Sequence, residues 1–285
     1  MRGSAGAAWI MGSCGVAWSL SGALASSGQE ASYRDLGTSS YSLFNPTPRE
    51  LRRGMSPDRP DTTESPITVD AGVVQLEMSF FDLSKNGSHR TWTAAPFNLK
   101  LGLTESMDIQ FVLDPYLHVR EDGRGRLAHG LGDLQVRLKL NLWGNDGGST
   151  AFGVMPFIKV PTAGAGLGND HVEGGVILAL SWDAAPGVGL AFMVEPDIVY
   201  DEADDDHDLE LLHTAVLGLD ITDRVGWFIE YAGVVSADAS PYRAEAITGF
   251  TLAVTDDLML DCGVRLGLTG DADDWGLFAG MSIRF

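Results

Sequence analysis

The sequence is poor in cysteine, with only Cys14 and Cys262 among 285 residues. Cys14 lies in an N-terminal stretch that we expect to be removed, so no intramolecular disulfide is expected in the mature protein. Cys262 alternates in step with Leu260 and Val264, which predicts a small apolar residue in the wall of a sheet rather than a reactive thiol. The fold must therefore be stable without a disulfide.

Basic residues and long apolar runs are also scarce. The chain has 19 Lys and Arg against 39 Asp and Glu, a net charge of -20. Binding to nucleic-acid phosphates needs clustered basic residues, so nucleic acid is excluded as a partner. Beyond the N-terminus no run approaches the roughly 18 apolar residues of a membrane-spanning helix. A helical membrane protein is therefore excluded.

The N-terminus has the pattern of an export signal. Arg2 precedes a small and apolar stretch from Ala5 to Leu24, and residues 23–25 match the small-x-small rule for cleavage. We expect a signal peptide over residues 1–25 and a mature chain that starts near Ser26. A retained membrane anchor is the alternative, and Cys14 follows only a poor lipoprotein motif.

Residues 26–68 are rich in Ser, Pro, Thr and Arg and show no sustained period. This composition predicts an irregular N-terminal arm. Its local basic cluster consists of Arg49, Arg52 and Arg53.

Residues 69–285 alternate between apolar and polar side chains with a period of two. The clearest segment runs from Asp133 to Leu142, where every even position is apolar and every odd position is polar or charged. A strand with one face in lipid and the other in water requires this alternation, and an amphipathic helix could not separate the two sets. The sequence thus predicts an all-β fold, a transmembrane antiparallel up-and-down β-barrel.

One predicted strand changes phase. Trp92 and Ala94 are apolar at even positions, whereas Phe97 and Leu99 are apolar at odd positions. A bulge at Pro96, which lies between the two sets, would explain the change.

Counting the alternating segments gives about twelve strands, an even number as bacterial barrels require. Connections are tight near residues 104, 184, 222 and 255, and longer near residues 86, 123, 166 and 205, as expected for short periplasmic turns and longer outer loops. Ten strands and a soluble β-sandwich are the alternatives. The expected strands span residues 71–81, 90–103, 107–119, 130–142, 150–160, 171–182, 187–199, 209–221, 224–235, 243–254, 258–268 and 275–285.

Several motifs resemble one family of bacterial outer-membrane proteins. They are Asp58-Arg59-Pro60-Asp61-Thr62-Thr63-Glu64-Ser65-Pro66 with Val69, Gly72, Val74, Gln75, Leu76 and Glu77 after it, then Pro156, Lys159 and Pro161-Thr162, and finally Leu260-Asp261-Cys262-Gly263. The sequence resembles the transporters named after the meta-pathway of phenol degradation. That resemblance implies passage of small, often aromatic or apolar compounds across the outer membrane, although substrate does not follow from fold.

Charged and polar residues on the non-lipid face are expected to line the lumen. The charges of these residues alternate in sign between neighbouring strands, so cross-strand ion pairs can form. On the later strands acidic residues are in excess. A barrel of twelve strands has a modest bore, so we expect a charge ladder around a restricted passage rather than an open pore. The expected lumen residues are Gln75, Glu77, Lys100, Asp108, Gln110, Asp133, Arg137, Lys139, Glu195, Asp197, Glu230, Asp261, Arg265 and Arg284.

The arm carries charges complementary to this lumen. We predict that it enters from the periplasmic side as a plug, with Arg52, Arg53 or Arg59 against an acidic wall residue, namely Glu195, Glu230 or Asp261. A loose periplasmic tail is the alternative.

Other functional classes have weaker signals. No enzymatic activity, cofactor or metal site is expected, because the acidic run at 201–208 lacks the spacing of a calcium-binding loop and no helix follows the glycines at 164–168. An outer-membrane lipid hydrolase is an alternative, with Ser88 adjacent to His89 and His118 expected to face the lumen. A structural barrel without transport is another alternative.

Phe285 ends the last alternating segment and resembles the terminal aromatic signal of outer-membrane assembly. We therefore expect the outer membrane as location. The expected partners are lipid and lipopolysaccharide, the barrel-assembly machinery and a small-molecule substrate.

Overall fold

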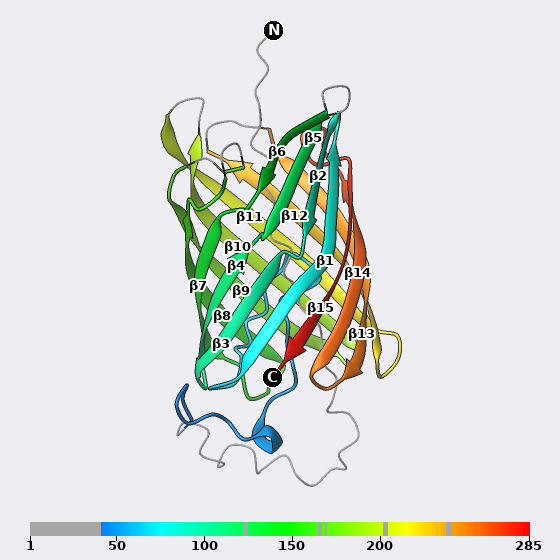
Figure 1. Cartoon of the computed structure of the whole chain (residues 1–285). Helices are drawn as coiled ribbons and strands as arrows, with labels where there is room; N and C mark the ends of the chain where they lie inside the picture. The colour runs from blue at the N-terminus through cyan, green and yellow to red at the C-terminus, as the bar shows by residue number, and fades with distance from the viewer. Residues whose placement is uncertain (1–40, 122–124, 165–166, 169, 202–204, 238–240) are drawn as a thin grey trace.

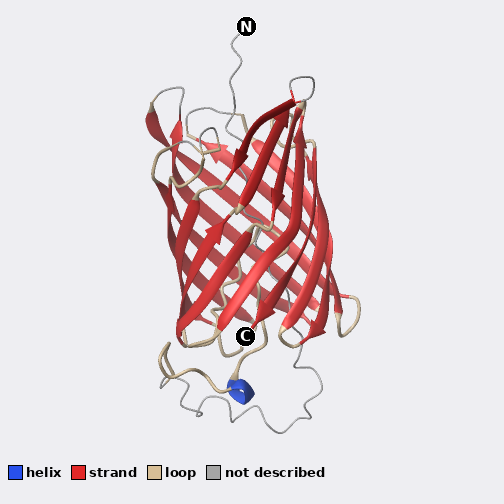
Figure 2. Ribbon diagram, in the orientation of Figure 1, coloured by secondary structure: helices blue, strands red, loops and turns tan. Residues whose placement is uncertain are grey.

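The computed structural model describes residues 41–121, 125–164, 167–168, 170–201, 205–237 and 241–285. The expected signal peptide and the first part of the expected arm, up to residue 40, lie outside the described residues. The strands of the described residues, which begin at Val74, form one closed antiparallel β-sheet (Figures 1 and 2).

The sheet contains fifteen labelled strands, and β15 pairs with β1 to close it. Their bounds are β1 Val74–Asn86, β2 His89–Ala94, β3 Phe97–Thr104, β4 Met107–Leu113, β5 Tyr116–Glu121, β6 Gly125–Gly130, β7 Leu134–Trp143, β8 Thr150–Val160, β9 Glu173–Ala185, β10 Val188–Asp201, β11 Asp206–Asp220, β12 Val225–Ser236, β13 Arg243–Thr255, β14 Leu258–Gly267 and β15 Trp275–Arg284.

Three pairs of labelled strands are each one strand of the wall with an interruption. The second wall strand consists of β2 and β3, because both pair with β1. The third consists of β4 and β5, and the fourth of β6 and β7. The barrel therefore has twelve wall strands, which confirms the expected number over the alternative of ten. Each wall strand pairs with its neighbour in the sequence, as in an up-and-down barrel.

The alternation of the sequence decides which side chains face the lumen. On β1, Gln75 and Glu77 are buried, whereas Val74, Leu76 and Met78, which alternate with them, are partly exposed on the outer face. The outer face of the whole barrel carries large exposed apolar side chains, among them Ile158, Phe192 and Phe250. Cys262 is exposed and faces this outer surface.

The interruption at Pro96 is confirmed. Ala95 has a positive φ of 52°, and the buried side chains change from Thr93 on β2 to Asn98 on β3, from an odd to an even position. Proline cannot donate a hydrogen bond to the ladder, so the strand breaks there and changes phase.

A second phase change was not expected and makes one prediction wrong. The third wall strand breaks at Asp114-Pro115, and Leu117 rather than His118 faces inward, opposite the buried Thr93. His118 lies opposite Trp92, which is exposed on the outer face. It therefore does not face the lumen. The interruptions of the second to fourth wall strands lie side by side in the sheet.

The connections at the end of the barrel that carries Phe285, here called the lower rim, are mostly tight. The connection from Gly144 to Ser149 is longer, and its Asn145 contacts the arm. At the opposite upper rim the expected longer connection near Asn86 is wrong, because β1 and β2 extend further and are joined by Gly87 and Ser88 alone. Within the described residues, no helix is long and apolar enough to span a membrane.

Candidate functional site

The described chain before β1, residues 41–73, forms the site together with the lumen. It extends the expected arm of residues 26–68, because β1 begins only at Val74. A short 3-10 turn at Arg49–Leu51 lies at the lower rim, and the following chain runs up into the barrel, as Figure 1 shows in blue. Asp58, Asp61 and Thr63 have no exposed surface, and nearly every residue from 57 to 71 is buried. The buried segment thus occupies the lower lumen, whereas the residues that flank it meet the wall, because the amides of Leu43 and Gly72 donate to the carbonyls of Leu103 and Gly102 on β3.

Asp58 is the centre of a buried ion cluster. Its carboxylate pairs with Lys100 on β3 and, at 2.6 Å from Nζ to Oδ1, with Lys139 on β7. Glu77 on β1 pairs with Lys100 and accepts hydrogen bonds from the backbone amides of Asp58 and Arg59. The two lysines are 1% exposed. Buried charges are tolerated only when they are paired, so the arm and the wall are mutually complementary here.

Arg59 makes the second contact. Its Nε and Nη2 donate to the two carboxylate oxygens of Asp261 on β14 at 3.1 and 2.6 Å, and its Nη1 donates to Ser79. Gly280 of β15 makes room for this guanidinium, because a Cβ there would lie 2.5 Å from Nη2. The fork geometry fixes the orientation as well as the charge of Arg59.

The top of the arm is held by two further wall residues. Glu230 on β12 accepts hydrogen bonds from the amides of Thr62 and Thr63 at 2.7 and 2.8 Å and from the Thr63 hydroxyl. Glu64 pairs with Arg137 on β7. The arm therefore spans the lumen from β7 to β12.

The arm returns to β1 along a third set of contacts. Asp108 on β4 accepts hydrogen bonds from the amide of Val69 and from Gln110, both at 2.9 Å, and Gln110 accepts one from Asn98. Asn145 in the long lower turn accepts a hydrogen bond from the Thr68 amide and donates one to its hydroxyl. Both ends of the buried segment are thus tied to the wall.

The basic cluster of the arm lies at the lower rim. Arg53 pairs with Asp70, and Arg52 donates to the carbonyl of Phe285, whose side chain is exposed. Arg284 pairs with Asp257 and donates to the carbonyl of Arg53. These contacts cross the seam between β1 and β15.

Asp257, in the turn between β13 and β14, has a lowered pKa. Partial burial alone would raise it, but hydrogen bonding and charge from Arg284, with the charges of Arg49 and Arg52, outweigh that effect. The Asp257 carboxylate is therefore held in its charged form.

Four more expected lumen residues lie elsewhere on the wall. Asp133 accepts a hydrogen bond from the Ala163 amide and lies 3.8 Å from Lys159. Glu195 and Asp197 lie on the lumen face of β10 near Arg137. Arg265 pairs with Asp82, and its guanidinium carbon lies 5.4 Å from the centre of the Phe278 ring.

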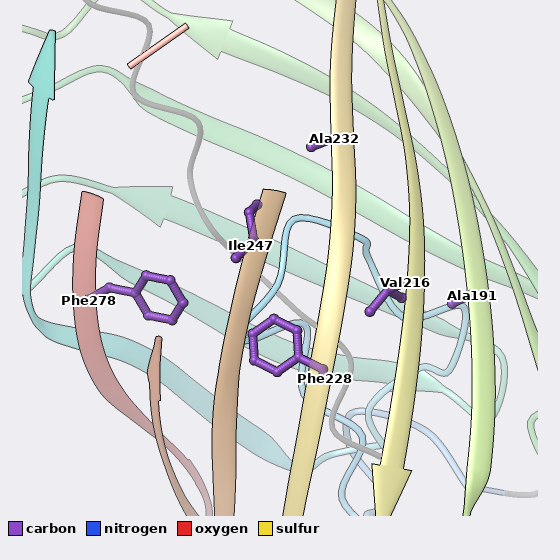
Figure 3. Packing of buried hydrophobic residues seen from close by; sticks show 6 residues of the cluster. All are labelled: Ala191, Val216, Phe228, Ala232, Ile247 and Phe278. Carbon is purple, nitrogen blue, oxygen red and sulfur yellow. The ribbon is translucent and has the colours of Figure 1, made fainter. Parts of the chain in front are cut away.

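The lumen faces of the later strands are largely apolar. One cluster, drawn in Figure 3, contains Phe228, Ile247 and Phe278 on separate strands, with Ala191, Val216 and Ala232 beside them. A second cluster contains Met155, Ile177, Met193, Leu212 and Val234, with Phe157 packed against it. The amide of Glu64 approaches the sulfur of Met193 at 3.4 Å. The lumen around the arm therefore has an ionic side and a largely apolar side.

The structure brings together one of the arm–wall pairs considered from the sequence, Arg59 with Asp261. Arg52 and Arg53 remain at the rim, and Glu230 receives backbone amides instead of an arginine. Sequence reasoning missed Asp58 and Glu64, the acidic arm residues that pair with wall cations. The signal was present, because both belong to the most specific motif and Lys100, Arg137 and Lys139 needed partners.

A family model described as "Putative MetA-pathway of phenol degradation" matches residues 57–285, which include the buried segment and the barrel. The chain belongs to this family. No curated protein sequence is significantly similar to this family member.

Solved structures share the fold of this family member. An outer-membrane channel from Pseudomonas putida F1 has a TM-score of 0.56 at 14% identity, over 75% of this chain and 94% of that one. The porin NanC has a TM-score of 0.51 at 10% identity, over 74% of this chain and 98% of that one. These likenesses show that the chain shares the barrel fold of outer-membrane channels.

Proposed function

We propose that this family member is an outer-membrane channel for small apolar compounds, aromatic ones included, and that its arm is a plug. The observation that carries the proposal is the buried arm inside a closed barrel, held by side chains of opposite walls. Paired charges hold the arm on one side of the lumen, and the apolar clusters lie on the other side.

The outer surface supports the location. Large apolar side chains such as Phe192 and Phe250 are exposed around the barrel, which suits the lipid of an outer membrane. The lower rim, with the tight turns and Phe285, then faces the periplasm. Lipid and lipopolysaccharide are the surroundings of the barrel in this proposal, and the exposed Phe285 is the contact for the assembly machinery. Fractionation of cells expressing the full chain tests the location.

The lumen supports the substrate class. The buried Met155, Ile177 and Met193 would give an apolar solute a surface that an ordinary water-filled porin lacks. The description of the family also refers to phenol degradation. Small phenols and similar aromatics are therefore the first solutes to examine.

A hydrolase is not favoured by the positions of its candidate residues. Ser88 lies in the tight hairpin at the upper rim, and His118 faces the outer surface. A structural barrel without transport remains the second candidate, and the buried arm is the observation that favours it, because a permanently bound arm would restrict passage.

The deciding experiment compares the mature chain with a variant that lacks the residues before Val69. In planar bilayers the truncated barrel should show a higher conductance, and in liposomes it should admit small phenols faster. Replacement of Phe44, an exposed arm residue, by Ala is the control and should leave both unchanged. Unchanged conductance after truncation would reject the plug, and failure of both forms to admit any solute would favour a structural barrel.

A further inference from the structure

Three carboxylates share a single guanidinium above the arm. Arg137 pairs with Glu64, and its charge also acts on Glu195 and Asp197 of β10. Two other carboxylates nearby have their own cations, because Glu173 pairs with Lys159 and Glu210 pairs with Arg243. Of the three carboxyl groups around Arg137, only Glu64 forms an ion pair with this guanidinium.

The oxygens of this group lack partners. Glu64 is 3% exposed, yet its Oε2 has no hydrogen-bond partner in the described part of the chain, and the same holds for the buried Oδ1 of Asp197. Among the described residues, the side chains of Glu195 and Asp197 form no hydrogen bond or ion pair. Buried carboxylate oxygens without partners are costly, so this arrangement calls for a positive group that is not part of the chain.

An apolar surface adjoins the carboxylates. Both the ring of Phe157 and the Oδ1 of Asp197 lie over the backbone of Gly175, in the space that a Cβ would fill. Met193 is on the same face of β10 as Glu195, two residues away, and its sulfur touches the amide of Glu64. Leu212 lies opposite Glu195 in the ladder. An aromatic ring and thioether sulfur thus lie beside the unpartnered oxygens.

The spacing favours an organic cation over a metal ion. Within the described residues no three His, Cys, Asp or Glu side chains are placed to hold a metal. An ammonium has three donors that can reach separate carboxylates, and an aromatic face such as Phe157 attracts it further. Methionine sulfur also contacts aromatic rings favourably.

We propose that Glu195, Asp197 and Glu64, together with Phe157, form a binding site for an organic ammonium carried on an aromatic body. The ammonium lies between the carboxylates, and the ring lies on Phe157 and Met193. The inference rests on the proposed function, because it names one class of solute for the same lumen.

The test uses the full mature chain in detergent and isothermal titration calorimetry. The probe is 2-phenylethylammonium at neutral pH, and the comparison compounds are 2-phenylethanol and phenylacetate, which keep the ring and change the charge. We expect the ammonium to bind at least about tenfold more tightly than the alcohol, because hydrogen bonds to charged groups are stronger than those between neutral groups. Phenylacetate should bind more weakly than either.

The variant Glu195→Gln with Asp197→Asn keeps the shape and removes both charges, so it should lose the preference for the ammonium. The control Glu245→Gln changes a carboxylate on the lumen face of β13, near Arg265, and should keep it. Heat-modified mobility in electrophoresis shows that both variants are folded. Equal affinity for ammonium and alcohol, absence of saturable ammonium binding, or a preference unchanged in the double variant would overturn the proposal.

The outcome separates the two proposals. Passage of neutral phenols without ammonium binding would reject the site and leave the channel. Ammonium binding in detergent, with no passage of any solute through the truncated barrel, would reject the channel and leave the site.

Discussion

The two sides of the lumen hold the arm by different physics. On β1, β3, β4 and β7 the lumen face is ionic, and Glu77, Lys100, Asp108 and Lys139 are each at most 1% exposed. On β8 to β13 it is apolar, apart from a few carboxylates such as Glu230 and Glu195. Ion pairs and hydrogen bonds are directional and fix the register of the arm, whereas apolar contact depends mainly on area.

The two sides should affect the passage of a solute differently. An arm that leaves the ionic side must leave buried charges without partners, which makes departure costly, whereas the apolar side would accept a solute in place of the arm. The ionic side therefore controls how long the arm stays, and the apolar side provides the surface for what passes. Four substitutions test this difference between the two sides, from the largest expected effect to the smallest.

The largest effect is expected for Asp58→Ala on the ionic side. It removes the carboxylate that pairs with Lys100 and Lys139, and breaking a buried pair typically costs about 3–5 kcal/mol. The arm should leave the lumen, seen as faster hydrogen exchange of the amides of Asp58, Arg59 and residues 61–65 and as higher conductance. Glu50→Ala, at the exposed rim turn, is the control. Protection equal to the unchanged protein would show that the cluster does not hold the arm.

Glu230→Gln tests the carboxylate that holds the arm on the otherwise apolar side of the lumen. The variant keeps one acceptor oxygen but loses the charge that binds three donors of Thr62 and Thr63, at a cost of about 1.5–3 kcal/mol. Hydrogen exchange should accelerate at Thr62 and Thr63 more than at Asp58. A uniform acceleration along the arm would mean that the two sides do not act separately.

Gly153→Leu tests the apolar side by volume alone. A Cβ at Gly153 on β8 would lie 3.0 Å from the Cα of Pro66, so a leucine would push the arm away without changing a charge. Overpacking of this kind costs about 1–3 kcal/mol. Conductance should rise moderately, and Gly270→Leu, where no atom lies near and φ is not positive, is the control. No change would indicate that the arm adapts by shifting within the lumen.

The smallest effect is expected at the lower rim. Because the pKa of Asp257 is lowered in the folded state, its stabilising contribution is present above the unfolded pKa near 3.8 and is lost as the pH falls through the folded pKa. Arg284 is the main cause of this lowering, and because the interactions lie at the rim, where Arg49 is 80% exposed, they contribute about 1 kcal/mol or less. Acid titration of the melting temperature, compared with Asp257→Asn, measures this contribution. An equal acid dependence of the variant would contradict this assignment.

Much of the barrel could be predicted because strand faces follow a local rule. The period of two placed Glu77 and Lys100 on one face, and Pro96 predicted the first interruption, since a proline cannot donate to the ladder. The second interruption at Pro115 was missed, and His118 was therefore assigned to the wrong face. The lengths of β1 and β2 above the membrane were also missed, because their polar residues no longer alternate clearly.

The sequence by itself determined an all-β chain with twelve alternating wall strands, a lipid-facing surface and an irregular arm before the first strand, because each of these depends on neighbours along the chain. Only the tertiary structure decided how the arm lies. Asp58 meets Lys139, and Thr63 meets Glu230, across separations of 81 and 167 residues. The sequence shows which charges need partners, but closure of the barrel decides which of them come within hydrogen-bonding distance.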